Sequence, residues 1–156
     1  MHIRILAVGG RQPTWVDDAF DGYASRLPRH WQFQLKTLPM AARGKNQSAD
    51  AAIRAEGKSI LAELKPGERM IALDERGEQC GSTALADRLA EWQADGRDLC
   101  FVIGGPDGLA PECTASADQC WSLSRLTLPH GLARVLLVEQ LYRAWSLSTG
   151  HPYHRA

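Results

Sequence analysis

A glycine-rich turn follows a short, continuous apolar stretch, residues 99–103, near the middle of the chain. Gly104 and Gly105 carry no side chain, so a ligand could approach the backbone N–H and C=O groups of the turn directly. An apolar stretch without polar alternation is typical of a strand buried on both faces of a parallel sheet. Ligands of open α/β sheets bind beyond the carboxyl ends of the strands. The turn therefore predicts a binding site, against the alternative of an ordinary strand-to-helix connection.

The motifs that are missing around this turn restrict the kind of ligand. The sequence contains no G-x-G-x-x-G and no G-x-x-x-x-G-K-[ST], the turns with which proteins cradle nucleotide phosphates. It also lacks the G-x-S-x-G elbow of a serine hydrolase. A glycine turn without these signatures fits a cofactor that carries no phosphate and is held by backbone groups and an apolar pocket.

The C-terminal tail combines residue types suited to an RNA partner. Tyr153 and His154 can stack on an unstacked base, and Arg155 can hold a phosphate. Metal ligation by His151 and His154 is the less favoured interpretation. The four cysteines form no C-x-x-C pair, so we expect no metal site and no redox motif.

A net charge of zero conceals an uneven distribution of charge. Residues 1–49 carry seven Lys and Arg against three Asp and Glu, residues 50–120 seven against fourteen, and residues 121–156 four against one. If the two basic ends meet in space, they form the positive surface that RNA requires. Arg43 and Lys45 flank Gly44 in a basic loop suited to a phosphate backbone, although a merely solvated loop has the same composition.

Strand-like and helix-like stretches alternate along the chain. The sequence predicts strands over 2–8, 31–38, 69–74, 99–103 and 121–128, and helices over 13–27, 48–64, 82–95, 109–119 and 132–149. This order predicts an α/β fold, a mostly parallel sheet with helices on both faces, in one domain over residues 1–156. No apolar run approaches the roughly 20 residues of a membrane span, and the start is too short in apolar residues for a signal peptide. We expect a cytoplasmic protein with no membrane partner.

The last predicted helix is apolar on more than one face. Such a helix must be buried on more than its core side, either centrally or under a second copy of the chain. We favour a symmetric homodimer, which would also bring duplicate basic tails together. Within this helix Glu139 and Arg143 are four residues apart and are expected to pair.

Several motifs along the whole chain resemble one family. They are Ala7-Val-Gly9, Arg43-Gly-Lys-Asn46, Ile103-Gly-Gly-Pro-Asp-Gly-Leu109, Trp121-Ser-Leu-Ser124, Leu126-Thr-Leu-Pro-His130, Glu139-Gln-Leu-Tyr-Arg-Ala-Trp145 and His151-Pro-Tyr-His-Arg155. Together they resemble the ribosomal RNA large subunit methyltransferase H family. The resemblance implies a SPOUT-class fold with a C-terminal trefoil knot, and a homodimer. It also implies methyl transfer from S-adenosylmethionine to N3 of a pseudouridine in 23S ribosomal RNA, acting at the ribosomal subunit interface.

The resemblance assigns roles to individual positions of this sequence. The cofactor pocket of the family corresponds to Leu73, Gly104, Leu123, Ser124, Arg125, Leu126, Thr127 and Leu128. Arg125 fits only a contact made through its backbone. RNA contacts are expected from Arg43, Lys45, His130 and Arg155.

The remaining role is to assist the chemistry at the base. The imide N–H of the base must lose its proton, so a nearby base or cation should help. Our candidates are His154, then Arg155 and Arg143, with Tyr153 orienting the base. Two other functions stay open at this point. A non-catalytic RNA-binding assembly factor would need the basic surface but no glycine pocket, and a small-molecule methyltransferase would need neither the basic loop nor the tail.

Overall fold

Ten regular elements alternate along the computed structural model, which describes residues 1–154. The strands are β1 (Ile3–Val8), β2 (Gln34–Leu38), β3 (Arg69–Glu78), β4 (Leu99–Ile103) and β5 (Gln119–Trp121). The helices are α1 (Thr14–Ala24), α2 (Ala49–Glu63), α3 (Ser82–Asp95), α4 (Pro111–Ser116) and α5 (His130–Thr149), with two short 3-10 helices, η1 (Arg29–Trp31) and η2 (Pro152–His154). Among these residues no helix has the length and apolar character needed to cross a membrane.

The strands form one sheet in the order β2-β1-β4-β3-β5, and all four pairings are parallel. The apolar strands β1 and β4 lie at its centre, where every residue of both is buried. Because all strands point the same way, their carboxyl ends meet along one edge of the sheet. This confirms the α/β class with a parallel sheet that the alternation of elements predicts.

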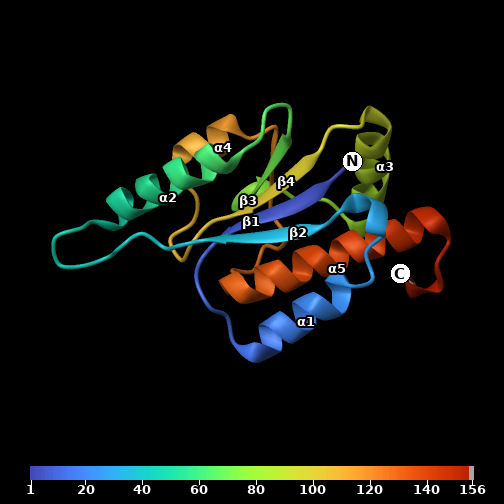
Figure 1. Cartoon of the computed structure of the whole chain (residues 1–156), viewed down its shortest axis with the longest axis horizontal. Helices are drawn as coiled ribbons and strands as arrows, with labels where there is room; N and C mark the ends of the chain where they lie inside the picture. Colours follow the sequence, from blue (N-terminus) through green and yellow to red (C-terminus); the bar gives the residue numbers. More distant parts are fainter. Residues whose placement is uncertain (155–156) are drawn as a thin grey trace.

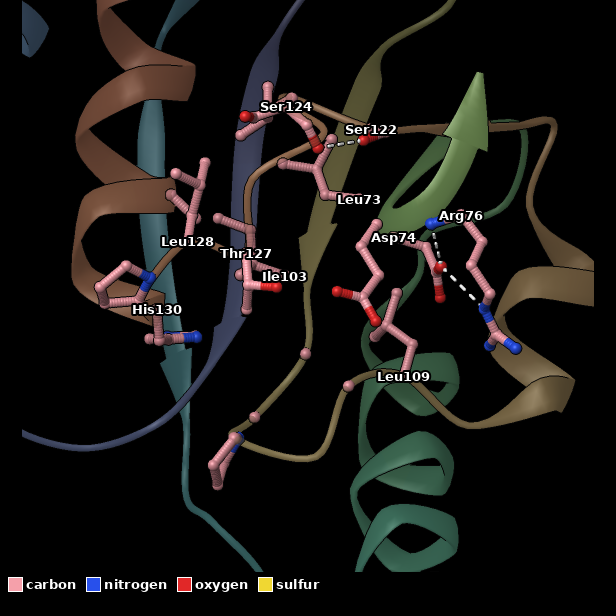
Figure 2. A pocket seen from close by; sticks show the side chains of 18 of the residues that line it. Leu73, Asp74, Arg76, Ile103, Leu109, Ser122, Ser124, Thr127, Leu128 and His130 are labelled. Carbon is pink, nitrogen blue, oxygen red and sulfur yellow. Dashed lines mark hydrogen bonds and ion pairs between the residues drawn. The ribbon is translucent and has the colours of Figure 1, made fainter. Parts of the chain in front are cut away.

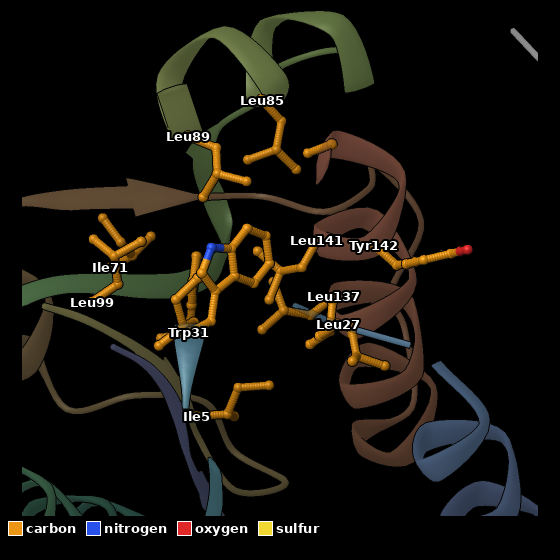
Figure 3. Packing of buried hydrophobic residues seen from close by; sticks show 14 of the residues in the cluster. Ile5, Leu27, Trp31, Ile71, Leu85, Leu89, Leu99, Leu137, Leu141 and Tyr142 are labelled. Atoms are coloured by element: carbon orange, nitrogen blue, oxygen red, sulfur yellow. The ribbon is translucent and has the colours of Figure 1, made fainter. Parts of the chain in front are cut away.

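Helices cover both faces of the sheet (Figure 1). On one face α1, α3 and α5 pack over a core that includes Ile5, Phe101 and Trp31. On the other face α2 and α4 enclose a second core built on Leu6, Val102 and neighbouring residues. Alternate residues of β1 and β4 therefore enter opposite cores, as the two-residue period of a strand requires. Figure 3 shows Trp31 between the strands and α5.

Helix α5 lies between α1 and α3, and its core side carries Leu137, Val138 and Leu141. Another side of the same helix faces solvent, where Leu132 and Leu136 are 36% and 37% exposed. The sequence predicts a helix that is apolar on more than one face, and inside one chain only part of that apolar surface is buried. A large apolar side chain left on a helix surface is available to a partner.

Two predicted strands have different boundaries. The strand expected over 121–128 ends at Trp121, because Ser124 turns the chain with local bonds: its carbonyl accepts from Ser122 Oγ at 2.8 Å and its Oγ accepts from Leu126 N at 2.8 Å. Local bonds of this kind compete with a sheet ladder. The strand expected over 31–38 begins only at Gln34, since η1 precedes it and Gln32 has a left-handed φ of 44°.

The strand predicted over 69–74 is longer in the structure, because β3 continues to Glu78. The register against β5 shifts between Leu73 and Glu78, and both residues pair with Trp121. Gly77 permits this close approach, since a Cβ there would lie 2.5 Å from the carbonyl carbon of Trp121. Gly77, which lies beyond the predicted strand, is therefore required by strand packing.

Candidate active site

A cavity of about 750 Å³ opens at the carboxyl ends of β3, β4 and β5 (Figure 2). Thr127, Leu128 and His130 lie on one side of it, and Asp74 and Leu109 on the other. Its lining includes seven of the eight residues predicted to hold a cofactor, namely Leu73, Gly104, Leu123, Ser124, Leu126, Thr127 and Leu128. The eighth, Arg125, is exposed and is not part of the lining. The cavity lies where the parallel sheet predicts a ligand.

The glycine turn (residues 104–108) presents bare main chain to this cavity. Gly108 N donates to Gly105 O at 3.0 Å, so the turn closes on itself. A Cβ at Gly104 would lie 2.7 Å from the carbonyl carbon and oxygen of Gly108 and 2.9 Å from Leu109 N. Gly108 has a φ of +86°, which L side chains rarely adopt. Two of the glycines are therefore needed for the shape of the turn itself.

His130 lines the same cavity but is not arranged as a phosphate-binding cation. Its Nε2 accepts a hydrogen bond from Arg134 Nε at 3.1 Å. Burial lowers the pKa of His130, and the Arg134 charge lowers it further. Arg134 is only 3% exposed and reaches Gly9 O at 3.5 Å. The structure thus favours a neutral imidazole, and Arg134 connects it to Gly9 at the end of β1. The RNA contact predicted for His130 stays a prediction.

The two cations of the basic loop (residues 39–47) have different environments. Arg43 donates to Asp107 Oδ2 at 2.7 Å and to Glu56 Oε2 at 2.8 Å, and these hydrogen bonds raise its pKa, the Glu56 bond most. Lys45 is exposed at the tip of the loop, where Gln47 N donates to Gly44 O at 3.1 Å. Lys45 is therefore available to RNA, whereas the Arg43 guanidinium is hydrogen-bonded to carboxylates of the protein.

Near the middle of α5 the carboxylate of Glu139 binds two of the predicted catalytic residues. Glu139 Oε1 accepts from Tyr153 Oη at 2.9 Å and from Arg143 Nη2 at 2.6 Å. The Tyr153 ring packs on Tyr142 with centroids 4.6 Å apart and lies under the Arg143 guanidinium at 5.1 Å. Burial raises the pKa of the Tyr153 hydroxyl, and hydrogen bonds with Tyr23 and Glu139 raise it further. Tyr153 is therefore a neutral hydrogen-bonding group.

Two other predicted tail residues fall partly or wholly outside the described residues. His154 ends η2, and its side chain lies outside what the structure describes. Arg155 lies outside the described residues altogether. Among residues 1–154 no group of three or more His, Cys, Asp or Glu side chains could hold a metal ion.

The cavity and the tail lie at different levels of one helix, since the tail packs back on α5 and Tyr153 reaches Glu139. Helix α5 has 20 residues, with His130 at the cavity and the tail following Thr149. At ~1.5 Å per residue the helix is about 30 Å long. Figure 1 shows the chain ending beside the end of α5 that lies away from the start of the helix. The residues predicted for the cofactor and the residues of the tail therefore form two separate groups, and Glu139 in the middle of α5 is the part of the helix that the tail reaches.

Comparison with known proteins agrees with this architecture. The family described as "Predicted SPOUT methyltransferase" matches residues 1–154. "Ribosomal RNA large subunit methyltransferase H" of Marinomonas sp. (strain MWYL1) is 49% identical over 155 residues, which are 99% of this chain and 100% of that relative. The protein of the same name from Pseudomonas putida (strain W619) is 46% identical over the same shares. The chain belongs to this family of SPOUT methyltransferases.

Solved structures share the fold of this SPOUT methyltransferase at low sequence identity. A probable methylase family protein from Haemophilus influenzae Rd KW20 has a TM-score of 0.59 and 12% identity, covering 99% of this chain and 70% of that one. A probable methyltransferase from Bordetella pertussis Tohama I has a TM-score of 0.56 and 15% identity, covering 92% and 95%. At such identities the likeness shows the fold alone.

Three groups of this methyltransferase that the sequence did not single out for the site prove important in its geometry. Glu56 is 3% exposed and holds Arg43, and Asp107 joins the same cluster from the glycine turn. Arg134 is the buried cation behind His130. No local spacing reveals a contact between residues 43, 56 and 107, whereas His130 and Arg134 are four apart at the start of a predicted helix and could have been paired.

Proposed function

We propose that this enzyme transfers a methyl group from S-adenosylmethionine to N3 of a pseudouridine in 23S ribosomal RNA, at the ribosomal subunit interface, working in the cytoplasm. Membership of the methyltransferase H family supports the reaction and the RNA. The observation that carries the cofactor is the cavity against the bare main chain of the glycine turn.

The cavity fits a phosphate-free, positively charged cofactor. Its volume of about 750 Å³ lies within the roughly 300–1,000 Å³ usual for small-molecule sites. Its charged lining is Asp74, Glu75 and Asp107 against Arg76, which gives one positive and three negative charges and a net charge of −2 with His130 neutral. Such a lining repels phosphates and suits a sulfonium. When bound, the cofactor supplies an already activated methyl group.

The chain's own residues then have to position the base and handle its proton. Proximity and alignment provide much of the rate when the transferred group is already reactive. Glu139 orients both Tyr153 and Arg143, and the guanidinium can stabilise the charge that appears on the imide as its proton leaves. We keep His154 as the first candidate to take that proton, with Arg155 as a second cation for the RNA.

A homodimer completes the site in this proposal. In one copy the Tyr153 hydroxyl is bonded to Glu139, which lies ~14 Å along α5 from His130 at the cavity, and this is too far for Tyr153 to contact a methyl group held there. A two-fold partner whose α5 runs in the opposite direction would bring its tail to this cavity. The exposed Leu132 and Leu136 on α5 are suitable contacts for such a partner.

The trefoil knot is also part of the proposal. The chain leaves β5 at one edge of the sheet and returns along the cavity loop (residues 122–129) past the ends of β3 and β4 before α5 begins. This return path is compatible with a knot, which is rare in proteins. A crystal structure traced from end to end would test it.

The function is tested by binding and by product mapping. Calorimetry with S-adenosylhomocysteine should show saturable binding to the protein, while the same titration with ATP, a phosphate-bearing control, should show none. Incubation of the enzyme with S-adenosylmethionine and either ribosomes or naked rRNA, followed by mass mapping, should place one methyl group on a pseudouridine. Absence of S-adenosylhomocysteine binding, or a methyl group on another base, would overturn the proposal.

A further inference from the structure

The basic loop (residues 39–47) and the glycine turn (residues 104–108) are fastened together by one side chain. We propose that Arg43 is a positioning residue: it couples occupancy of the cofactor cavity to the placement of Lys45 on RNA, and does not itself bind phosphate. This inference rests on the proposed function, and it assigns Arg43 a different role from the RNA contact expected from the sequence.

The hydrogen-bonding capacity of Arg43 is almost entirely used inside the protein. Its Nε donates to Asp107 Oδ2 at 2.7 Å, and its Nη1 donates to Glu56 Oε2 at 2.8 Å and to Ala41 O at 3.0 Å. Its Nη2 donates to Glu56 Oε1 at 3.1 Å. A guanidinium has five N–H donors, so these four bonds leave little for a phosphate. To contact RNA, Arg43 would have to abandon a buried carboxylate.

Glu56 joins the loop to the back of the turn. Its side chain is 3% exposed, and its Oε2 also accepts from Ala41 N at 2.9 Å. A Cβ added at Gly105 would lie 3.1 Å from Glu56 Oε1, so the carboxylate sits directly behind the turn. Breaking this pair by removing Arg43 alone would leave a buried charge without a partner, which is strongly destabilising. The loop and the turn therefore move together or separate at high cost.

The charge of the cluster also speaks against phosphate binding. Arg43 contributes one positive charge and Glu56 and Asp107 contribute two negative charges, so the cluster has a net charge of −1. Lys45, two residues further along, is exposed, and no acidic group is within ion-pair distance of it among the described residues. The tip cation is thus the one with a free charge for RNA.

Asp107 supplies the link to the cavity. Asp107 lines the cavity, and its side chain is 41% exposed. A ligand bound against the turn would therefore contact the same residue that accepts a hydrogen bond from Arg43. If the ligand stabilises this position of the turn, it also stabilises the docked loop, and by linkage RNA held at the loop must strengthen cofactor binding equally.

The test measures RNA affinity with and without S-adenosylhomocysteine, at several salt concentrations, using a 23S stem-loop that contains the target pseudouridine. The decisive variant is Arg43→Gln combined with Glu56→Gln, which avoids an unpaired buried carboxylate. Asp107→Asn is a second variant that leaves the buried pair intact, and Lys45→Ala is the matched control. The dimeric full chain is used throughout.

In the wild type, S-adenosylhomocysteine should tighten RNA binding by at least about fivefold, the lower end of typical coupling. Both the double variant and Asp107→Asn should lose this enhancement, while their dependence of log Kd on log salt keeps its wild-type slope. Lys45→Ala should keep the enhancement and lose about 0.7–0.9 of slope, as one phosphate contact predicts.

Two results would overturn the inference while leaving the proposed function in place: a slope that falls in the double variant as it does in Lys45→Ala, or an enhancement that survives in both the double variant and Asp107→Asn. Wild-type protein that fails to bind S-adenosylhomocysteine at all would overturn the proposed function and this inference with it.

Discussion

The separation of cavity and tail makes a quantitative prediction about mixed dimers. Gly104→Ala impairs the cavity, and His154→Ala impairs the tail that follows α5. Because Tyr153 of the tail is held at Glu139, ~14 Å along α5 from the cavity of its own chain, each site should combine the cavity of one copy with the tail of the other. We therefore expect each variant alone to be inactive and their mixture to regain activity.

The size of the recovery follows from counting sites. Random exchange of equal amounts makes about half of the dimers mixed, as expected for a two-fold homodimer, and each mixed dimer has one intact site of two. The expected activity is therefore about one quarter of that of wild-type protein at the same total concentration. In a mixed dimer the intact cavity belongs to the His154→Ala copy, and the intact tail belongs to the Gly104→Ala copy.

The assay is methyl incorporation into ribosomes after the two variants are mixed, denatured and refolded together, with each variant refolded alone as a control. Light scattering verifies that both variants dimerise. If the mixture is no more active than the sum of its separate components, each chain uses its own tail, and the argument from the position of Tyr153 along α5 is refuted.

Four further perturbations test individual parts of the site. Gly104→Ala should destabilise the fold by ~1–3 kcal/mol, because its Cβ would lie 2.7 Å from the main chain of Gly108, and it should abolish S-adenosylhomocysteine binding. Thermal unfolding measures the first effect and calorimetry the second. An unchanged affinity would contradict the role of the turn. Glu139→Gln should lower kcat about tenfold and leave the affinity for S-adenosylhomocysteine unchanged, since the charge-assisted bonds that orient the tail are weakened. An equal loss of kcat and of S-adenosylhomocysteine affinity would count against a positioning role. His130 has a folded-state pKa below 6.5, so the unfolded state binds more protons once the pH falls below 6.5, and stability declines from there through the lower folded pKa. Urea unfolding of His130→Asn should show less of this acid-side decline than wild type, and an identical decline would be inconsistent with a buried neutral imidazole. Leu136→Asp should leave the free energy of unfolding of one chain within about 0.5 kcal/mol but shift light scattering to a monomer, whereas a persistent dimer would place the interface elsewhere.

The sequence predicted most of the framework, because buried parallel strands have an unambiguous pattern. Every residue of β1 and of β4 is apolar apart from Arg4, whose guanidinium donates a hydrogen bond to Glu68 at 2.6 Å. The glycine turn and its place at the carboxyl end of β4 followed from the same pattern. The cofactor cavity could be predicted for the same reason, since its position depends on strand direction more than on side-chain detail.

The parts that could not be predicted depend on contacts between distant segments. Apolar residues recur among polar ones from Trp121 to Leu128 and predict a strand, yet Ser124 forms local hydrogen bonds and the segment becomes a loop. Arg43 has the composition of a phosphate ligand, but its partners are 13 and 64 residues away. The residues next to Glu56 and Asp107 in the sequence do not indicate that either carboxylate pairs with Arg43. Local pattern identifies an element or a charge, and the tertiary partner decides what it does.

The proposed dimer places a further constraint on α5. If Tyr153 of one copy, held at Glu139, meets the cavity of the other copy at His130, and the reverse, the two-fold axis must pass about midway between residues 130 and 139 of α5. Leu132, Leu136, Glu139 and Arg143 follow one another at helical spacing and so share a face. Two antiparallel copies of that face would place Leu132 and Leu136 near the axis, and Glu139 of each copy beside the start of α5 in the other. A carboxylate in an interface is costly unless it is paired, and each Glu139 accepts a 2.6 Å bond from its own Arg143. In the proposed dimer the Glu139–Arg143 pair would therefore lower the cost of bringing Glu139 into the interface, in addition to orienting Tyr153.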